Sequence, residues 1–322
     1  MFEVALWGVF LAVALFVLVR GADLFVTGAK QMGLALGMSK FAIGVLIVGF
    51  GTSLPELASS IAAVMRGATE IVIANAVGSN ITNILLVVGI LGTLAGRIVI
   101  KRDLIKTELP IFFIATAHFL MVVSDKVIDR VESVLLLGTF AAYLWYLFHE
   151  ARTEDKVELE SQGRRPRLEY KSVVFIALGL VAVLVGAKYS VDMVINIATF
   201  FSVPVALISI AAIAIGTSLP ELSVSLRALK TNETELAIGN IFGSNAFNIL
   251  VVIGVSAFIT PLSADAVVMQ LGVPILLASS AIFFVNGLAR QIMRWEGMML
   301  LLFFAFFLVK LTEFCVQCLA AV

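Results

Sequence analysis

The sequence has 322 residues, of which 61% are hydrophobic and 14% charged, and its mean hydropathy is +1.09. This composition excludes an ordinary water-soluble domain, because most of the chain must contact lipid. The formal net charge is +0, so no basic surface for nucleic acid is predicted. Two cysteines, Cys315 and Cys318, are too few for a structural zinc site, and we expect them to be packing or tail residues.

A membrane-spanning helix needs about 20 mainly apolar residues. By this measure the sequence predicts ten spans, at 4–26, 41–65, 71–95, 107–123, 131–148, 172–194, 203–226, 236–259, 265–286 and 295–314. These segments are too long and too uniformly apolar for barrel strands, so we predict an all-α integral membrane protein. The first span lacks the positive flank of a secretory signal, and we expect it to be retained.

A polar stretch at 150–171 divides the spans into two groups of five and is predicted to be a linker. The first half is then 1–149 and the second 172–322. Because each half has an odd number of spans, the second half enters the membrane from the opposite side, which predicts two inverted five-helix repeats. The loops on the linker side hold most of the Lys and Arg residues, which places the N-terminus outside and the linker in the cytoplasm.

One motif is written twice, 165 positions apart. Gly-Thr-Ser-Leu-Pro-Glu-Leu at 51–57 recurs at 216–222, and the Asn75, Gly-Ser-Asn and Asn83 positions that follow it recur as Asn240, 243–245 and Asn248. Both copies place a glutamate, Glu56 and Glu221, inside an apolar segment. An ionised side chain is expensive there and indicates a functional site, and paired interrupted segments of this kind are typical of secondary transporters.

The residue types of the motif favour a hard-cation site. Pro55 and Pro220 interrupt the helix, which we expect to free backbone carbonyls near Gly49 and Ala214. These carbonyls would join Thr and Ser hydroxyls, Asn amides and two carboxylates in an all-oxygen set suited to Ca²⁺, Na⁺ or Mg²⁺. The two histidines, at 118 and 149, lie outside the motifs. One Ca²⁺ would neutralise the two glutamates, and several Na⁺ or protons could replace it.

Other interpretations compete with ion binding. Ser53 with Glu56, and Ser218 with Glu221, also fit a helix capping box, while the Gly-Ser-Asn segments could serve close helix packing. A membrane hydrolase with a serine nucleophile would need a general base beside the serine, and neither histidine is near a motif. A passive channel would conduct ions without a counter-ion, and it does not account for paired acidic residues in inverted repeats. We therefore expect a transporter without enzymatic activity.

The duplicated motifs resemble the two α-repeats of sodium/calcium exchangers, in the cation/calcium exchanger superfamily, and the likeness covers nearly the whole chain. The resemblance implies Glu56 and Glu221 as central Ca²⁺ ligands. It implies backbone carbonyl ligands at Thr52, Thr217, Gly49 and Ala214, with Na⁺ sites lined by Ser53, Ser79, Ser218, Ser244 and Asn83. It also implies exchange of about three Na⁺ for one Ca²⁺, with the first and sixth helices sliding against a fixed core.

One position departs from the family pattern, because Asn248 stands where many members have Asp. We include Asn248 in the site as the symmetric partner of Asn83, but the neutral pair puts the stoichiometry and any potassium co-transport in doubt. The expected function is an electrogenic antiporter of a cytoplasmic membrane that extrudes Ca²⁺, with H⁺ coupling or broader divalent specificity as the alternative. We expect no cofactor and no obligatory protein partner, with Ca²⁺, Na⁺ and the lipid bilayer as the chain's partners.

Overall fold

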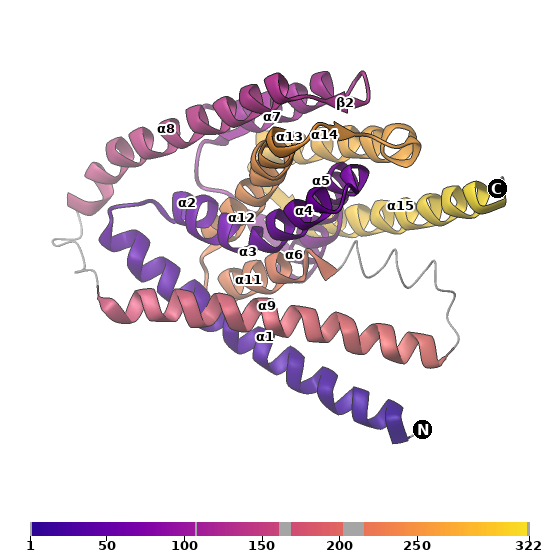
Figure 1. Cartoon of the computed structure of the whole chain (residues 1–322). Helices are drawn as coiled ribbons and strands as arrows, with labels where there is room; N and C mark the ends of the chain where they lie inside the picture. The colour runs from indigo at the N-terminus through magenta and orange to yellow at the C-terminus, as the bar shows by residue number, and fades with distance from the viewer. Residues whose placement is uncertain (1, 107, 161–168, 202–215, 321–322) are drawn as a thin grey trace.

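The computed structural model describes residues 2–106, 108–160, 169–201 and 216–320 (Figure 1). The described part of the chain is mainly helical. The first half contains α1 (Phe2–Ala35), α2 (Lys40–Ile43), π-helix η1 (Gly44–Gly49), α3 (Phe50–Thr52), α4 (Leu54–Met65), α5 (Thr69–Thr82), π-helix η2 (Asn83–Val87), α6 (Val88–Ala95), 3₁₀-helix η3 (Leu104–Lys106), α7 (Glu108–Val122) and α8 (Arg130–Glu160). The second half contains α9 (Tyr170–Phe200), α11 (Leu219–Lys230), α12 (Thr234–Phe247), π-helices η4 (Asn248–Val252) and η5 (Val268–Gly272), α13 (Ile253–Ile259), α14 (Val273–Ala289) and α15 (Arg294–Ala320).

Several helices are long and apolar enough to cross a bilayer. Among the described residues six qualify alone, and a seventh qualifies if the bent pair Lys40–Thr52 and Leu54–Met65 is one span. Large apolar side chains such as Trp145, Met121 and Leu302 are more than 70% exposed, as expected for side chains that face lipid. The prediction of an all-α integral membrane protein is confirmed. The predicted span 203–226 lies largely outside the described residues, so the count of ten stays a prediction.

Helix boundaries extend beyond several predicted spans. The prediction for the first span was 4–26, whereas α1 runs to Ala35, and α8 continues through Glu160 into the segment predicted as a linker. The structure therefore makes the start of that linker helical. Once the apolar part of a helix is fixed, polar residues with ordinary helix propensity can prolong it outside the membrane.

The local structure repeats at the 165-residue offset. Helices α4 and α11 both have 12 residues with a proline in the first turn, and α5 and α12 both have 14 residues and lead into a π-helix. At this offset β1 (Arg97–Val99) corresponds to β3 (Leu262–Ser263), and β2 (Val127–Ile128) corresponds to β4 (Gln291–Met293). Strand β1 pairs with β4 and β2 pairs with β3, so each half contributes one strand to each sheet. This reciprocity is what a two-fold relation between the halves requires.

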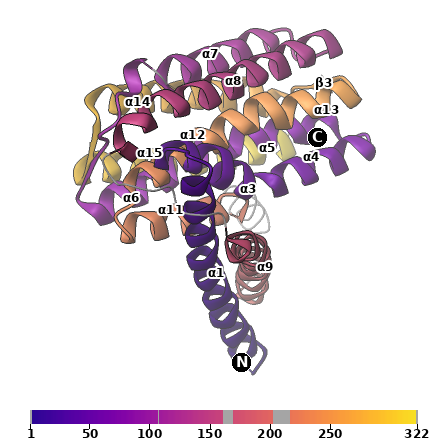
Figure 2. The ribbon, with the colours of Figure 1, turned by 90° about the vertical axis from the view of Figure 1, so that its left-hand side faces the viewer.

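Helices α1 and α9 form a closely packed pair at one side of the molecule. They cross one another outside the remaining helices in Figure 1, and in the view of Figure 2 they extend away from them. A Cβ at Gly28 would lie 2.7 Å from the carbonyl oxygen of Ser172, and one at Gly186 would lie 2.6 Å from the nitrogen of Leu18. The two backbones therefore touch, as small residues allow in membrane helix pairs.

Helix α12 begins the candidate span Thr234–Ile259, which continues through η4 and α13 and is the most buried of the candidate spans, with 89% of its most apolar stretch inside the protein. It packs against η1. A Cβ at Gly243 would lie 2.6 Å from the carbonyl oxygen of Val45, and a Cβ at Gly49 would lie 2.9 Å from the nitrogen of Ser244. Glycines at these positions let the two repeated motifs approach each other at the backbone level.

Candidate cation site

Each motif breaks its helix at a serine. The chain bends by 40° between α3 and α4, at Ser53, because Pro55 cannot donate a backbone hydrogen bond. In the second half the same break falls at Ser218, directly before α11. Neither serine side chain caps the helix that follows it, so the capping-box interpretation is wrong. The Ser53 hydroxyl is instead free to bond across the molecule.

The two motifs meet through their hydroxyl groups. Ser53 Oγ donates to Glu221 Oε1 at 3.3 Å, although the two residues are 168 positions apart. Ser79 Oγ and Thr217 Oγ1 lie 3.2 Å apart. We call the helix breaks at Ser53 and Ser218, with the motif residues around them, the hinges of the two repeats. The hinge of each repeat thus contacts the motif residues of the other. These contacts agree with the prediction that both copies contribute to one site.

Both glutamates are fully enclosed by protein. Glu56 is 1% exposed and Glu221 is 0% exposed, and each has one carboxylate oxygen, Oε2, with no hydrogen-bond partner. Ser53, which donates to Glu221, directly precedes the helix whose first turn carries Glu56, so the two carboxyl groups belong to one region. No ion pair among the described residues includes either glutamate. Two buried, uncompensated carboxyl groups therefore call for protons or cations that are not part of the chain.

Asn83 and Asn248 lie where α5 and α12 pass into their π-helices. Such local widening of a helix is frequent at functional sites. Both side chains are at most 1% exposed, and both carbonyl oxygens, Oδ1, lack a hydrogen-bond partner. Ser218 Oγ is also without a partner. Buried acceptors are almost always satisfied, so these oxygens are available to a ligand.

The carbonyl oxygen of Gly49 behaves differently from the prediction of freed carbonyls, while the carbonyl ligand at Thr52 stays a prediction. The carbonyl oxygen of Gly49 accepts hydrogen bonds from the nitrogen of Ser53 at 3.2 Å, from Ser244 Oγ at 3.2 Å and from Thr52 Oγ1 at 3.3 Å. The break at Pro55 does not leave this carbonyl without partners, because nearby hydroxyl groups reach it. Ala214, the corresponding predicted residue, lies outside the described residues.

Asn240 was not among the predicted site residues, although it belongs to the duplicated pattern. Its amide nitrogen donates to Ser225 Oγ at 2.7 Å and to the backbone carbonyl of Glu221 at 3.3 Å, and its Oδ1 accepts from Thr52 at 3.4 Å. Asn240 thus joins α12 to the helix that carries Glu221. Its position in the repeat was the available signal, since its counterpart Asn75 donates to Ser60 in the same way.

The described part of the site offers oxygen atoms and no sulfur or imidazole ligand. Among the described residues, no group of three or more His, Cys, Asp or Glu side chains could hold a metal ion. Two carboxylates with amide and hydroxyl oxygens match the preferences of hard cations such as Ca²⁺ and Na⁺. The unpartnered oxygens of Glu56, Glu221, Asn83, Asn248 and Ser218 fit this chemistry.

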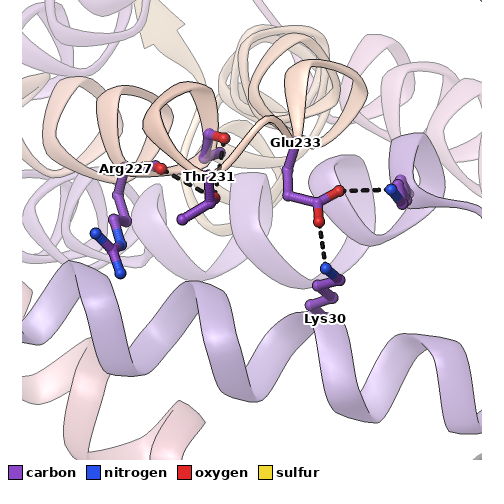
Figure 3. Close-up of polar contacts among 6 residues, drawn as sticks. Lys30, Arg227, Thr231 and Glu233 are labelled. Atoms are coloured by element: carbon purple, nitrogen blue, oxygen red, sulfur yellow. Dashed lines mark hydrogen bonds and ion pairs between the residues drawn. The ribbon is translucent and has the colours of Figure 1, made fainter.

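A second polar cluster lies at the end of α1 that leads into α2 (Figure 3). Glu233, at the start of α12, accepts from Lys30 of α1 and lies 2.8 Å from Lys40 Nζ of α2. Arg227 of α11 pairs with Asp23 of α1 at 2.7 Å. Lys30, Arg227 and Glu233 line a cavity of about 530 Å³ between α1, α9 and α11. These charged contacts connect the α1–α9 pair to the rest of the protein.

Comparison with known proteins agrees with this fold and site. The family model described as "Sodium/calcium exchanger protein" matches residues 6–149 and 171–312. The sodium/calcium exchanger MaX1 of Methanosarcina acetivorans is 32% identical over 94% of this chain and 97% of its own. The inner membrane protein YrbG of Escherichia coli is 33% identical over 85% of this chain and 86% of its own.

A solved structure is similar as well. The sodium-calcium exchanger NCX_Mj, in a crystal soaked with 2.5 mM Na⁺ and 0.1 mM Sr²⁺, superposes with a TM-score of 0.77 at 29% identity, covering 94% of this chain and 98% of that one. Fold, buried acidic site and matches together define a multi-pass membrane transporter. The chain belongs to the sodium/calcium exchanger family.

Proposed function

We propose that this chain is an electrogenic antiporter that exchanges Na⁺ for Ca²⁺ across the cytoplasmic membrane and normally extrudes Ca²⁺. The observation that carries the proposal is the pair of buried carboxyl groups of Glu56 and Glu221, which have unpartnered oxygens and form no ion pair with any described residue. One Ca²⁺ balances two carboxylates. About three Na⁺ in the same region would carry one extra positive charge, so each exchange cycle would move net charge.

The two ions would compete for the same oxygens. Ca²⁺ takes about 6–8 oxygen ligands in flexible geometry, and the two carboxylates are its natural centre. Na⁺ would use smaller groups of the surrounding atoms, including the hydroxyls of Ser53, Ser79, Ser218 and Ser244 and the amide oxygen of Asn83. An empty site leaves buried charge uncompensated. The protein would therefore switch the site from one side of the membrane to the other only when the site holds either Ca²⁺ or Na⁺. That condition couples the two ion flows.

Alternating access would come from the α1–α9 pair. Its two backbones touch through glycines, so the pair is suited to move as one body. The α1–α9 pair contacts the two repeated motifs through side chains and not through backbone. A Cβ at Gly51 would meet the ring of Phe25 of α1, and one at Gly216 would meet the side chain of Val191 of α9. We place the N-terminus outside and the 150–171 segment in the cytoplasm, as the distribution of Lys and Arg indicates.

The runner-up function is exchange of Ca²⁺ or another divalent cation for H⁺. Buried carboxyl groups can exchange protons as well as Na⁺, so the same residues would serve it. The hydroxyl and amide oxygens around the glutamates favour Na⁺, because a proton needs only the carboxylate. We propose no catalytic role: His118 bonds to Thr139 on the neighbouring helix, and His149 is far from the motif serines in sequence.

The test is Ca²⁺ uptake into proteoliposomes loaded with Na⁺. We expect an outward Na⁺ gradient to drive uptake, and a membrane potential, negative on the side that receives the excess Na⁺, to accelerate it. A pH gradient that replaces the Na⁺ gradient with equal effect would favour H⁺ exchange. Uptake that needs no counter-ion would contradict both forms of the proposal.

A further inference from the structure

Two buried asparagines, Asn80 and Asn245, lie beside the candidate cation site but are not among its predicted ligands. They occupy equivalent positions of the two repeats, near the ends of α5 and α12, and both are at most 1% exposed. An uncharged amide in a membrane interior is stable only if its polar atoms find partners. Three of their four side-chain polar atoms find partners in the opposite repeat, and the fourth, Asn245 Nδ2, has none.

The hydrogen bonds between the repeats are reciprocal. Asn248 Nδ2 donates to Asn80 Oδ1 at 3.1 Å, and Asn83 Nδ2 donates to Asn245 Oδ1 at 3.4 Å. A further bond, from Asn80 Nδ2 to the backbone carbonyl of Asn245 at 3.0 Å, joins the two acceptor residues. Asn80 of the first repeat thus holds Asn248 of the second, and Asn245 of the second repeat holds Asn83 of the first.

The direction of these bonds decides which end of each amide remains available. Asn83 and Asn248 use their NH₂ groups in the bonds, and their Oδ1 atoms are left buried and without a partner. A primary amide is planar, with nitrogen and oxygen on opposite sides of the carbon, so fixing the nitrogen also fixes the direction of the oxygen. The reversed amide would present hydrogens, which repel a cation.

We propose that Asn80 and Asn245 are positioning residues, which hold Asn248 and Asn83 so that their carbonyl oxygens face the transported cations. The inference rests on the proposed function, because it assumes that the buried oxygens receive cations. It adds a role across the repeats: the ligand of one repeat is oriented by the other. A change that separates α5 from α12 then alters ion affinity as well as packing.

The simpler role is to join two helices. Both roles predict that Asn80→Ala and Asn245→Ala lower the stability of the folded protein, so a stability measurement alone does not separate them. Positioning makes a further prediction about ion affinity: the sodium concentration for half-maximal Ca²⁺ exchange should rise on the order of fivefold, the effect of losing one hydrogen bond of about 1 kcal/mol. The maximal rate at saturating sodium should change less.

A double-mutant cycle tests the mechanism. If Asn80 acts through Asn248, then Asn80→Ala should weaken sodium affinity in the wild-type background and have almost no effect in the Asn248→Ala background. The same is expected of Asn245→Ala with Asn83→Ala. Asn286→Ala is the matched control, because Asn286 is also a buried asparagine, 5% exposed, but lies on α14 and takes no part in the hydrogen bonds among the four asparagines. It should leave sodium affinity unchanged.

Additive effects in both cycles, or an equal loss of affinity in Asn286→Ala, would overturn the proposal. A measurement without transport separates its failure from failure of the proposed function. In a high-resolution experimental structure of Asn80→Ala we expect the Asn248 side chain to turn from its wild-type direction. If it keeps that direction, Asn80 does not position it, whichever ions the protein carries.

Discussion

The ion pairs of Glu233 make the sharpest prediction about conformational change. In the structure this carboxylate joins Lys30 of α1 and Lys40 of α2 to the start of α12 (Figure 3). If the α1–α9 pair moves against the other helices, the contact between Lys30 and Glu233 must open at the end of α1 that we place in the cytoplasm, whereas Lys40 stays beside Glu233. Glu233→Gln keeps the shape of the side chain and removes its charge. It should therefore favour the conformation in which this end is open.

The structure sets the magnitude. The Glu233 side chain is 5% exposed, while the lysine side chains are 38% and 44% exposed. Exposed ion pairs contribute about 0.2–1 kcal/mol, and breaking a buried pair costs about 3–5 kcal/mol. This pair is intermediate, and the glutamine can still accept one hydrogen bond. We expect a shift of about 1–2 kcal/mol, which changes the ratio of the two conformations about 5- to 30-fold.

Cysteine accessibility measures this ratio. Val26 lines the cavity and is 4% exposed, so Val26→Cys, with Cys315 and Cys318 replaced by serine, should react slowly with a membrane-impermeant thiol reagent. Adding Glu233→Gln should accelerate the reaction about 5- to 30-fold. Glu313→Gln is the control, because Glu313 also pairs with a lysine but is 51% exposed and joins two residues of one helix, α15. Equal reaction rates in all three proteins would refute the reasoning.

Three further predictions concern stability. Gly186→Leu should lower the melting temperature, because a Cβ there would lie 2.6 Å from the nitrogen of Leu18 and overpacking costs about 1–3 kcal/mol. Gly8→Leu is the control and should leave the melting temperature unchanged, because a Cβ at Gly8 meets nothing within 4 Å. Equal melting temperatures in the two variants would contradict the close α1–α9 contact. Burial opposes ionisation of Glu233, but its bonds to two lysines outweigh burial and lower its pKa. The stabilisation it gives is thus fully present above the unfolded pKa of about 4.3 and lost as pH falls through the lower folded value. The difference in melting temperature between wild type and Glu233→Gln should persist at about pH 5 and vanish only below the usual Glu pKa; a difference already gone at neutral pH would count against the ion pairs. Asn248→Asp removes a buried hydrogen-bond donor worth about 1 kcal/mol and adds a negative charge. Without cations the variant should have a lower melting temperature than wild type, and added Ca²⁺ should raise its melting temperature by more. An equal rise in the two proteins would place position 248 outside the site.

The sequence predicted the central features because they depend on local chemistry. A proline inside an apolar run must break the helix, and a glutamate there must have a partner, so Pro55 with Glu56 could be interpreted without a structure. The duplication predicted that Glu221 would join the same site, and the bond from Ser53 to Glu221 agrees with it. The family resemblance correctly identified the fold class.

Other features depend on contacts between distant segments, which no local pattern encodes. The bond between Asn80 and Asn248 requires the relative rotation of two helices, and the hydroxyl bonds to Gly49 require their separation. The pairing of Asp23 with Arg227 was equally hidden, because Arg20 is the nearer partner of Asp23 in sequence. Such contacts follow from the crossing of the two repeats.

The central claim is that Glu56 and Glu221 bind the exchanged ions, and sodium-driven Ca²⁺ uptake by variants of these residues tests it most directly. Wild-type protein in sodium-loaded proteoliposomes should accumulate Ca²⁺, and Glu56→Gln combined with Glu221→Gln should abolish this uptake while the protein remains folded. Each single variant should be severely impaired, since one carboxylate cannot neutralise a divalent ion in a buried site. Sodium-driven uptake that survives in the double variant would contradict the account.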